Sequence, residues 1–240
     1  CVSWLQQNME RKDDHALFIF HWQQPWYDSV KAPFTSGMTS GLAMQVFLNA
    51  NRLQPDSSLL RDAALLLRGF AIPVEAGGFT YKEPVGWWFE EIADTGSHTP
   101  RILDGHMFAM LGLHHYYRQT GSQEALLYFK EGEKALKHYL PAYDAGHGEI
   151  RYDVYGKLAD KKYKRIITGQ LEQLWQISAD SVYWQYFRQW RQPMEKPYVY
   201  RAIRDRNRSG LILVALLWFA AAAVAYAITF ASRKFLGRRK

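Results

Sequence analysis

Two segments of the sequence bring aromatic and charged side chains together in a way that suits sugar chemistry. The first, residues 86–106, reads GWWFEEIADTGSHTPRILDGH and places Trp88, Glu90 and Glu91 directly before a predicted helix. The second, residues 148–165, reads GEIRYDVYGKLADKKYKR and interleaves tyrosines with Lys and Arg. Aromatic rings pack against the apolar faces of sugars, and cations suit acidic sugars. The alternative for each segment is a solvated turn with ordinary hairpin aromatics.

Other familiar catalytic signatures are missing from the sequence. It has no phosphate-binding glycine loop, no nucleophile elbow, no HExxH pair and no paired cysteines. The only cysteine is Cys1, which excludes a disulfide within the chain. His106, His114 and His115 share one predicted helix without the spacing of metal ligands, so structural roles are expected for them. We expect neither a metal nor a cofactor.

The positive charge of the chain is concentrated at its C-terminal end. Residues 201–240 hold nine Lys and Arg against one acid, whereas residues 1–200 hold 21 basic against 22 acidic residues. The net charge is therefore +8 for the first range and −1 for the second. A nearly neutral soluble part gives no support to nucleic-acid binding, and the basic end is placed to meet anionic lipid headgroups.

An uncharged apolar run, residues 210–231, predicts a transmembrane helix. A helix of its 22 residues is about 33 Å long, enough to cross a hydrocarbon core of about 30 Å. The alternative is a buried core helix. We expect a barrel domain at 1–195, a basic juxtamembrane linker at 196–209, the span at 210–231 and a basic tail at 232–240. The soluble domain of this single-pass protein is expected to be extracytoplasmic.

The soluble part reads as helical hairpins that repeat along the chain. Residues 40–70, 104–144 and 168–190 each hold two periodic apolar stretches around a polar or glycine break. Gly-rich segments between them favour short β-hairpins. The glycines that open the units are 64 residues apart: Gly41, Gly105 and Gly169. This period predicts an all-α fold, an (α/α) toroid or incomplete barrel, rather than an ordinary helical bundle.

The N-terminal segment shows a different pattern. Residues 1–14, CVSWLQQNMERKDD, predict a helix with Val2, Leu5 and Met9 on one face. Residues 15–28, HALFIFHWQQPWYD, are aromatic and predict extended chain that Pro25 interrupts.

Five short motifs, in order and at similar spacing, resemble the C-terminal domain of D-glucuronyl C5-epimerases. The resemblance runs over residues 33–190, about two thirds of the chain. The matching motifs are APFTSGMTSGLAM (32–44), WWFEE (87–91), ILDGHMFAMLGLHHYYRQTGSQEAL (102–126), LKHYLPAYDAGHGEIRYD (136–153) and YKRIITGQLEQL (163–174). The family's domain is an (α/α) barrel, which agrees with the repeat. The resemblance implies an enzyme that converts D-glucuronic to L-iduronic acid within an acidic polysaccharide.

The resemblance also implies roles for individual residues. Epimerisation removes the proton at C5 and returns one on the other face of the ring, which requires an acid and a base. By motif position we expect Tyr152 and Tyr163 to be the opposed acid and base, with Glu91 tuning one of them or acting as the base. The expected substrate-binding residues are Arg151, Lys164, Arg165, Gln170, Trp88 and Glu90.

Departures from the family pattern keep alternatives open. Ile92 stands where the family has a further catalytic tyrosine, and Tyr155 stands where it has an arginine. One alternative is a barrel that has lost catalysis and binds acidic glycan or scaffolds a membrane-protein complex. Another is a lyase, which shares C5 proton abstraction, or a hydrolase, which needs two opposed carboxylates. The candidates for those carboxylates are Glu90, Glu91 and Asp104.

Overall fold

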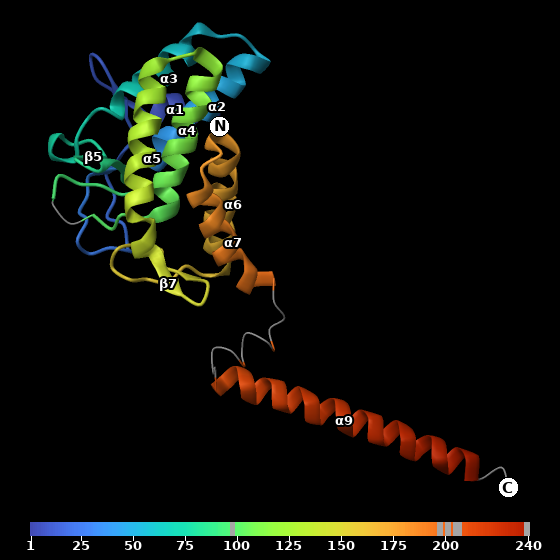
Figure 1. Ribbon diagram of the computed structural model, residues 1–240. Coiled ribbons are helices and arrows are strands. Elements are labelled where there is room, and N and C mark those ends of the chain that lie inside the picture. The colour runs from blue at the N-terminus through green and yellow to red at the C-terminus, as the bar shows by residue number, and fades with distance from the viewer. Residues whose placement is uncertain (97–98, 196–198, 200–202, 204–207, 238–240) are drawn as a thin grey trace. The chain divides into compact units, whose positions relative to one another are not determined.

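The computed structural model describes residues 1–96, 99–195, 199, 203 and 208–237 (Figure 1). The chain divides into two units, Cys1–Arg191 and Gln192–Lys240, and each is described by itself. The predicted linker at 196–209 and the last residues of the predicted tail, 238–240, lie largely outside the described residues. The domain boundaries drawn from the sequence therefore stay predictions.

Helices dominate the first unit, and short paired strands join them. The helices are α1 (Val2–Asn8), α2 (Gly37–Leu53), α3 (Ser57–Gly69), α4 (Leu103–Thr120), α5 (Gln123–Tyr143), α6 (Lys161–Ser178) and α7 (Ser181–Glu195), with a 3-10 turn at Val74–Ala76. The strands pair as β1 (Glu10–Arg11) with β2 (Ala16–Leu17), β3 (Ile19–Phe20) with β4 (Phe34–Thr35), β5 (Thr80–Glu83) with β6 (Gly86–Phe89), and β7 (Asp144–Gly146) with β8 (Glu149–Ile150). Every pair is antiparallel.

The predicted helical hairpins are confirmed as α2–α3, α4–α5 and α6–α7. Polar side chains cap the second helix of the first two hairpins: Asp56 accepts from Ser58 N at 2.7 Å at the start of α3, and Ser122 accepts from Ala125 N at 3.3 Å at the start of α5. The third hairpin begins at Lys161, earlier than the predicted 168, because Asp160 caps the helix there. Short β-hairpins precede α4 and follow α5, as expected.

Helices α2 and α4 form the closest helix pair of the unit. Figure 1 shows α2 to α6 packed side by side, with β7 beyond one end of α5. A Cβ at Gly41 of α2 would lie 2.9 Å from the Cα of Ala109, and one at Gly112 of α4 would lie 2.5 Å from the Cα of Gly41. The absence of side chains at Gly41 and Gly112 lets the two backbones touch. The three equally spaced glycines have different surroundings: Gly41 lies against α4, a Cβ at Gly105 would meet Glu91, and one at Gly169 would meet nothing within 4 Å.

The N-terminal segment differs from its prediction. The helix ends at Asn8 rather than at residue 14, and Met9 is extended and leads into β1. Antiparallel pairing of β1 with β2 replaces the last predicted turns. The extended conformation expected for residues 15–28 is confirmed at β2 and β3.

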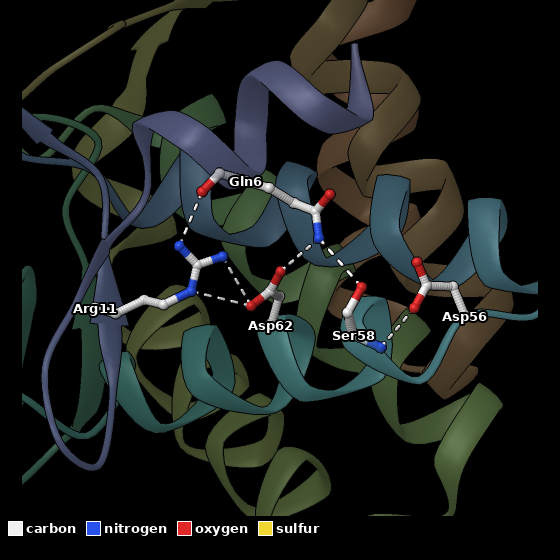
Figure 2. Close-up of polar contacts among 5 residues, drawn as sticks. All are labelled: Gln6, Arg11, Asp56, Ser58 and Asp62. Carbon is white, nitrogen blue, oxygen red and sulfur yellow. Dashed lines mark hydrogen bonds and ion pairs between the residues drawn. The ribbon is translucent and has the colours of Figure 1, made fainter.

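A polar cluster around Asp62 of α3 holds this N-terminal segment in place (Figure 2). Asp62 is buried, and its carboxylate accepts from Gln6 Nε2 at 2.8 Å and from Arg11 Nη2 at 2.9 Å. Arg11 also donates to the Gln6 backbone carbonyl at 2.9 Å, and Gln6 reaches Ser58 Oγ at 3.4 Å. One carboxylate therefore connects α1, β1 and α3.

Removing this carboxylate is expected to destabilise the fold. Asp62→Ala leaves Gln6 and the Arg11 guanidinium without their shared acceptor, which should lower the free energy of unfolding by about 1–3 kcal/mol. Chemical denaturation of the full chain in detergent measures this change. Arg61→Ala, at the neighbouring exposed position, is the matched control and should change it by less than about 0.5 kcal/mol. Equal effects of the two variants would show that the cluster contributes no stability.

The second unit contains α9 (Arg208–Gly237), a long apolar helix. Its segment Arg208–Phe230 has the length and composition needed to cross a membrane. Large apolar side chains on it are exposed, with Trp218 76% and Phe219 74% accessible. The alternative of a buried core helix does not describe this segment, since none of its most apolar stretch is buried.

Candidate active site

A cavity of about 350 Å³ lies in the first unit and collects residues from four separate parts of the chain. They come from the turn after β3, the segment after β6, the approach to α4 and the segment from β8 into α6. The lining residues are Trp26, Tyr27, Glu91, Ile92, Ile102, Tyr152, Lys157, Leu158, Asp160 and Tyr163. The three residues predicted to be catalytic therefore line the same cavity: Glu91, Tyr152 and Tyr163.

Glu91 reaches the cavity because the residue before it is firmly anchored. The backbone N–H of Glu90 donates to Phe79 O at 2.8 Å, and the Glu90 carbonyl accepts from Gly37 N at 2.7 Å. The Glu90 side chain is buried and accepts from Thr99 Oγ1 at 2.7 Å. Glu90 thus supports the chain, and its neighbour Glu91 faces the cavity.

Gly105, in the first turn of α4, leaves room for the Glu91 side chain. A Cβ at this position would lie 2.4 Å from Glu91 Cβ and 2.5 Å from Glu91 Oε2. Asp104 precedes it and lies close enough to Glu91 to act on its ionisation. Among the described residues, Glu91 Oε2 and Asp104 Oδ1 are buried with no hydrogen-bond partner. Two carboxylates with unsatisfied oxygens are therefore close together.

Burial and mutual repulsion shift the ionisation of these carboxylates. Loss of solvent, together with the Asp104 charge, raises the pKa of Glu91 to about 8. Burial raises the pKa of Asp104 to about 6, although backbone donors in the first helical turn and Tyr152 partly offset it. Glu91 is therefore poised to exchange a proton near neutral pH, as a general base requires.

Tyr152 and Tyr163 are in contact with each other. Their ring centroids are 4.7 Å apart, so no sugar ring fits between them and the expected opposed arrangement is not what the structure shows. Tyr152 is held by Leu103 N, which donates to its carbonyl at 3.0 Å, and Tyr163 N donates to Asp160 at 2.9 Å. Burial and the charges of the nearby carboxylates raise the pKa of Tyr152, which keeps its phenol protonated.

Lys157 supplies the cation in the cavity lining. The buried Asp153 accepts from Tyr155 N at 3.0 Å and from Lys157 N at 3.1 Å, which shapes the turn that presents this lysine. Its Nζ lies 5.6 Å from the centre of the Tyr152 ring and 5.8 Å from that of Tyr27. An ammonium group is therefore placed beside the rings of Tyr152 and Tyr27.

The other predicted cations do not line the cavity. Arg151 donates to the carbonyls of Ala142 at 2.8 Å and Asp144 at 2.7 Å. Lys164 forms an ion pair with Glu149. Arg165 is exposed on α6, outside the lining.

The remaining expected binding residues are buried. Trp88 is fully buried and stacks on His106 with ring centroids 4.0 Å apart. Gln170 is buried and donates to the Asp104 carbonyl at 3.0 Å, so it supports the first turn of α4. The full burial of His106 and its bond to Phe89 N agree with the structural role expected for it.

Sequence reasoning missed Trp26, Tyr27 and Lys157 as cavity residues. Trp26 and Tyr27 belong to a segment more than a hundred residues from Tyr152, and Tyr27 donates to Asp153 at 2.7 Å to close the distance. Lys157 is a single cation directly after Gly156, and the longer basic run 161–165 gives a stronger charge signal in the sequence. Among the described residues, no cluster of His, Cys, Asp and Glu is placed to hold a metal ion.

Solved structures share the fold of this chain. Cellobiose 2-epimerase from Spirochaeta thermophila DSM 6192 matches with a TM-score of 0.54 and 13% identity, over 79% of this chain and 49% of that one. A sugar epimerase from a ruminal bacterium matches with a TM-score of 0.52 and 14% identity, over 82% and 55%. These are (α/α) toroids, so the mostly helical prediction is confirmed, while closure of a complete toroid stays a prediction.

Sequence comparison identifies the family. An uncharacterized protein of Methanocaldococcus jannaschii is 30% identical over 187 residues, which cover 76% of this chain and 59% of that protein. The D-glucuronyl C5-epimerase of Caenorhabditis elegans is 30% identical over 132 residues, 50% of this chain and 21% of that enzyme. The chain thus spans only part of these relatives. The family model described as D-glucuronyl C5-epimerase C-terminus matches residues 12–192, and the chain belongs to that family.

Proposed function

We propose that the cavity binds a uronic acid unit of an acidic polysaccharide and exchanges the proton at its C5. The observation that carries this proposal is the meeting of Glu91, Tyr152 and Tyr163 in one cavity beside Lys157. A base, phenols and a cation are the groups that this chemistry needs. Membership of the epimerase family supports the same reaction.

In the proposed reaction Glu91 is the base and the tyrosine pair is the acid. Glu91 removes the C5 proton, and the electron pair of the C–H bond moves into the adjoining carboxylate. A phenol then returns a proton to C5 on the opposite face, which inverts the centre. The raised pKa of Tyr152 keeps its phenol protonated at neutral pH, so the proton is present to be given, and a pKa of about 8 suits the base. Asp104 tunes Glu91 by its nearby charge.

Lys157 is proposed to neutralise the substrate carboxylate. The intermediate adds negative charge to that group, so a cation near it lowers the barrier. Arg151, Lys164 and Arg165 were expected in this role, but the first two are bound to backbone carbonyls or to Glu149 and the third lies outside the lining. Lys157 lines the cavity and takes over the role in this proposal.

Deuterium incorporation tests the proposed function. The full chain in detergent is incubated in D₂O with a panel of uronic-acid polysaccharides, and NMR follows deuterium at C5. Incorporation together with iduronate-type products is expected. Products with new ultraviolet absorbance would point to the lyase, and new reducing ends would point to the hydrolase. No exchange with any polysaccharide of the panel would reject the epimerase assignment.

A second candidate is a barrel that binds acidic glycan without turnover. The observation that favours it is Ile92, which is buried in the cavity wall and brings no phenol where the family has a tyrosine. This candidate predicts binding of uronate oligosaccharides, measured by calorimetry, with no C5 exchange. The two candidates therefore differ in one measurement on the same protein.

We also propose that α9 anchors the protein in a membrane as a single span. Its length, its uncharged apolar residues and their exposure support the anchor. Extracytoplasmic placement of the barrel follows from the proposed substrate. Partitioning into the detergent phase, lost on truncation after residue 195, tests the anchor without reference to activity.

A further inference from the structure

An exposed tryptophan lies at the edge of the cavity. Trp26 is part of the cavity lining, yet 59% of it is accessible to solvent. Trp22, 48% accessible, stands beside it with ring centroids 5.9 Å apart and planes at 81°. Apolar rings of this size gathered at one place on a surface mark a binding site.

The turn that carries Trp26 is rigidly built. Gln24 is buried, and its side-chain oxygen accepts from Trp26 N and Tyr27 N, each at 2.8 Å. Its amide donates to Val30 O at 2.9 Å. One buried side chain thus replaces the backbone hydrogen bonds that a regular element would provide. The exposed ring is held in position before any ligand arrives, which lowers the entropic cost of binding.

The turn that carries Trp26 is also connected to the segment that carries Tyr152 and Lys157. The Tyr27 hydroxyl donates to Asp153 at 2.7 Å, and the Tyr27 ring lies under the Lys157 ammonium group. Asp153 is the neighbour of Tyr152 and shapes the Lys157 turn. Trp26 therefore keeps a defined place relative to Tyr152 and Lys157.

We infer that Trp26 forms a second sugar-binding position, which stacks on the sugar unit next to the uronic acid in the cavity. The inference rests on the proposed function for the identity of the cavity ligand. A pyranose presents an apolar C–H face that packs on an indole ring, while its hydroxyls stay in solvent. Trp22, nearly perpendicular to Trp26, borders that face. The ligand is accordingly a polymer or oligomer, and free glucuronate fills only the cavity.

Chain-length dependence of binding tests this position. Isothermal titration calorimetry of the full chain in detergent compares glucuronate with di-, tetra- and hexasaccharides of alternating glucuronic acid and N-acetylglucosamine. The wild type is expected to bind the oligosaccharides more tightly than the monosaccharide. Trp26→Ala should weaken oligosaccharide binding about 10-fold and glucuronate binding by much less, and Trp26→Phe should keep part of the gain.

Trp4→Ala is the matched control. Trp4 of α1 is 58% exposed and does not line the cavity, so its removal should change neither affinity. Unchanged thermal melting of the Trp26 variants would show that the fold is intact. Equal affinity of the wild type for all lengths, or equal loss in the Trp4 and Trp26 variants, would overturn the inference.

The result separates this inference from the proposed function. Length-dependent binding that requires Trp26, without C5 exchange in D₂O, would keep the second position and reject the epimerase. Exchange in the wild type with the same length dependence in Trp26→Ala would keep the epimerase and reject the second position.

Discussion

Tyr152→Phe is expected to abolish the proton exchange that inverts C5 of the polysaccharide while the protein stays folded. Loss of a positioned general acid typically costs about 100-fold or more in rate. Burial, together with the charges of Glu91 and Asp104, keeps the Tyr152 hydroxyl protonated by raising its pKa, and phenylalanine keeps the ring without the proton. Deuterium incorporation at C5 in D₂O, followed by NMR, measures the loss.

The variant Tyr163→Phe tests which of the two tyrosines donates the proton to C5. Their rings touch, and in the proposed reaction one of them gives the proton to the sugar while the other positions it. If Tyr163 is the donor, its variant loses exchange as fully as Tyr152→Phe does. If it only positions Tyr152, the variant keeps a measurable rate.

A tyrosine outside the cavity provides the control. Tyr117 lies on α4 and is absent from the cavity lining, so Tyr117→Phe should exchange deuterium at the wild-type rate. Full activity of both Tyr152→Phe and Tyr163→Phe would remove the phenols from the mechanism. Thermal melting of all three variants excludes unfolding as the cause of any loss.

Helices and their ends were predictable because their signals are local. Asp56 and Ser122 are N-cap residues that indicate the starts of α3 and α5, and an amphipathic stretch follows each of them. The end of α1 was not predictable from the sequence. Nothing within residues 1–14 shows that Glu10 and Arg11 pair with a strand, or that Arg11 reaches Asp62. Long-range contacts override local propensity there.

Some residues of the candidate site could likewise be predicted from the sequence, and others could not. Glu91, Tyr152 and Tyr163 could be found from motif order, and the structure brings them together. Trp88 and Arg151 have suitable chemistry at suitable sequence positions, but one is buried against His106 and the other is bound to backbone carbonyls. Sequence shows which groups are near along the chain, whereas burial and direction depend on packing.

Glu91→Gln is expected to remove C5 exchange and also to change how stability depends on pH. Gln has the size of the protonated Glu91 side chain but cannot accept the C5 proton. In the wild type, exchange should rise with pH and level off above about pH 8, where Glu91 is ionised. The protonated Tyr152 donor imposes no fall over that range, because its pKa is raised.

Stability should move in the opposite direction to activity. The folded protein holds the Glu91 proton up to about pH 8, whereas an exposed glutamate in the unfolded chain releases it near pH 4.5. Between these values the unfolded chain binds fewer protons than the folded protein, so the contribution of Glu91 to stability falls as pH rises. Above pH 8 the Gln variant should therefore be more stable than the wild type by more than about 1 kcal/mol.

Denaturation at several pH values tests this pairing of lost activity with gained stability. The difference in the free energy of unfolding between Glu91→Gln and the wild type should be small near pH 4.5 and should widen up to about pH 8. Glu172→Gln, on a partly exposed carboxylate of α6 outside the cavity, should leave the exchange rate unchanged. A constant difference at every pH would mean that Glu91 is not held protonated in the folded protein. In that case a carboxylate ionised at all working pH values, rather than one that ionises near pH 8, would be the base.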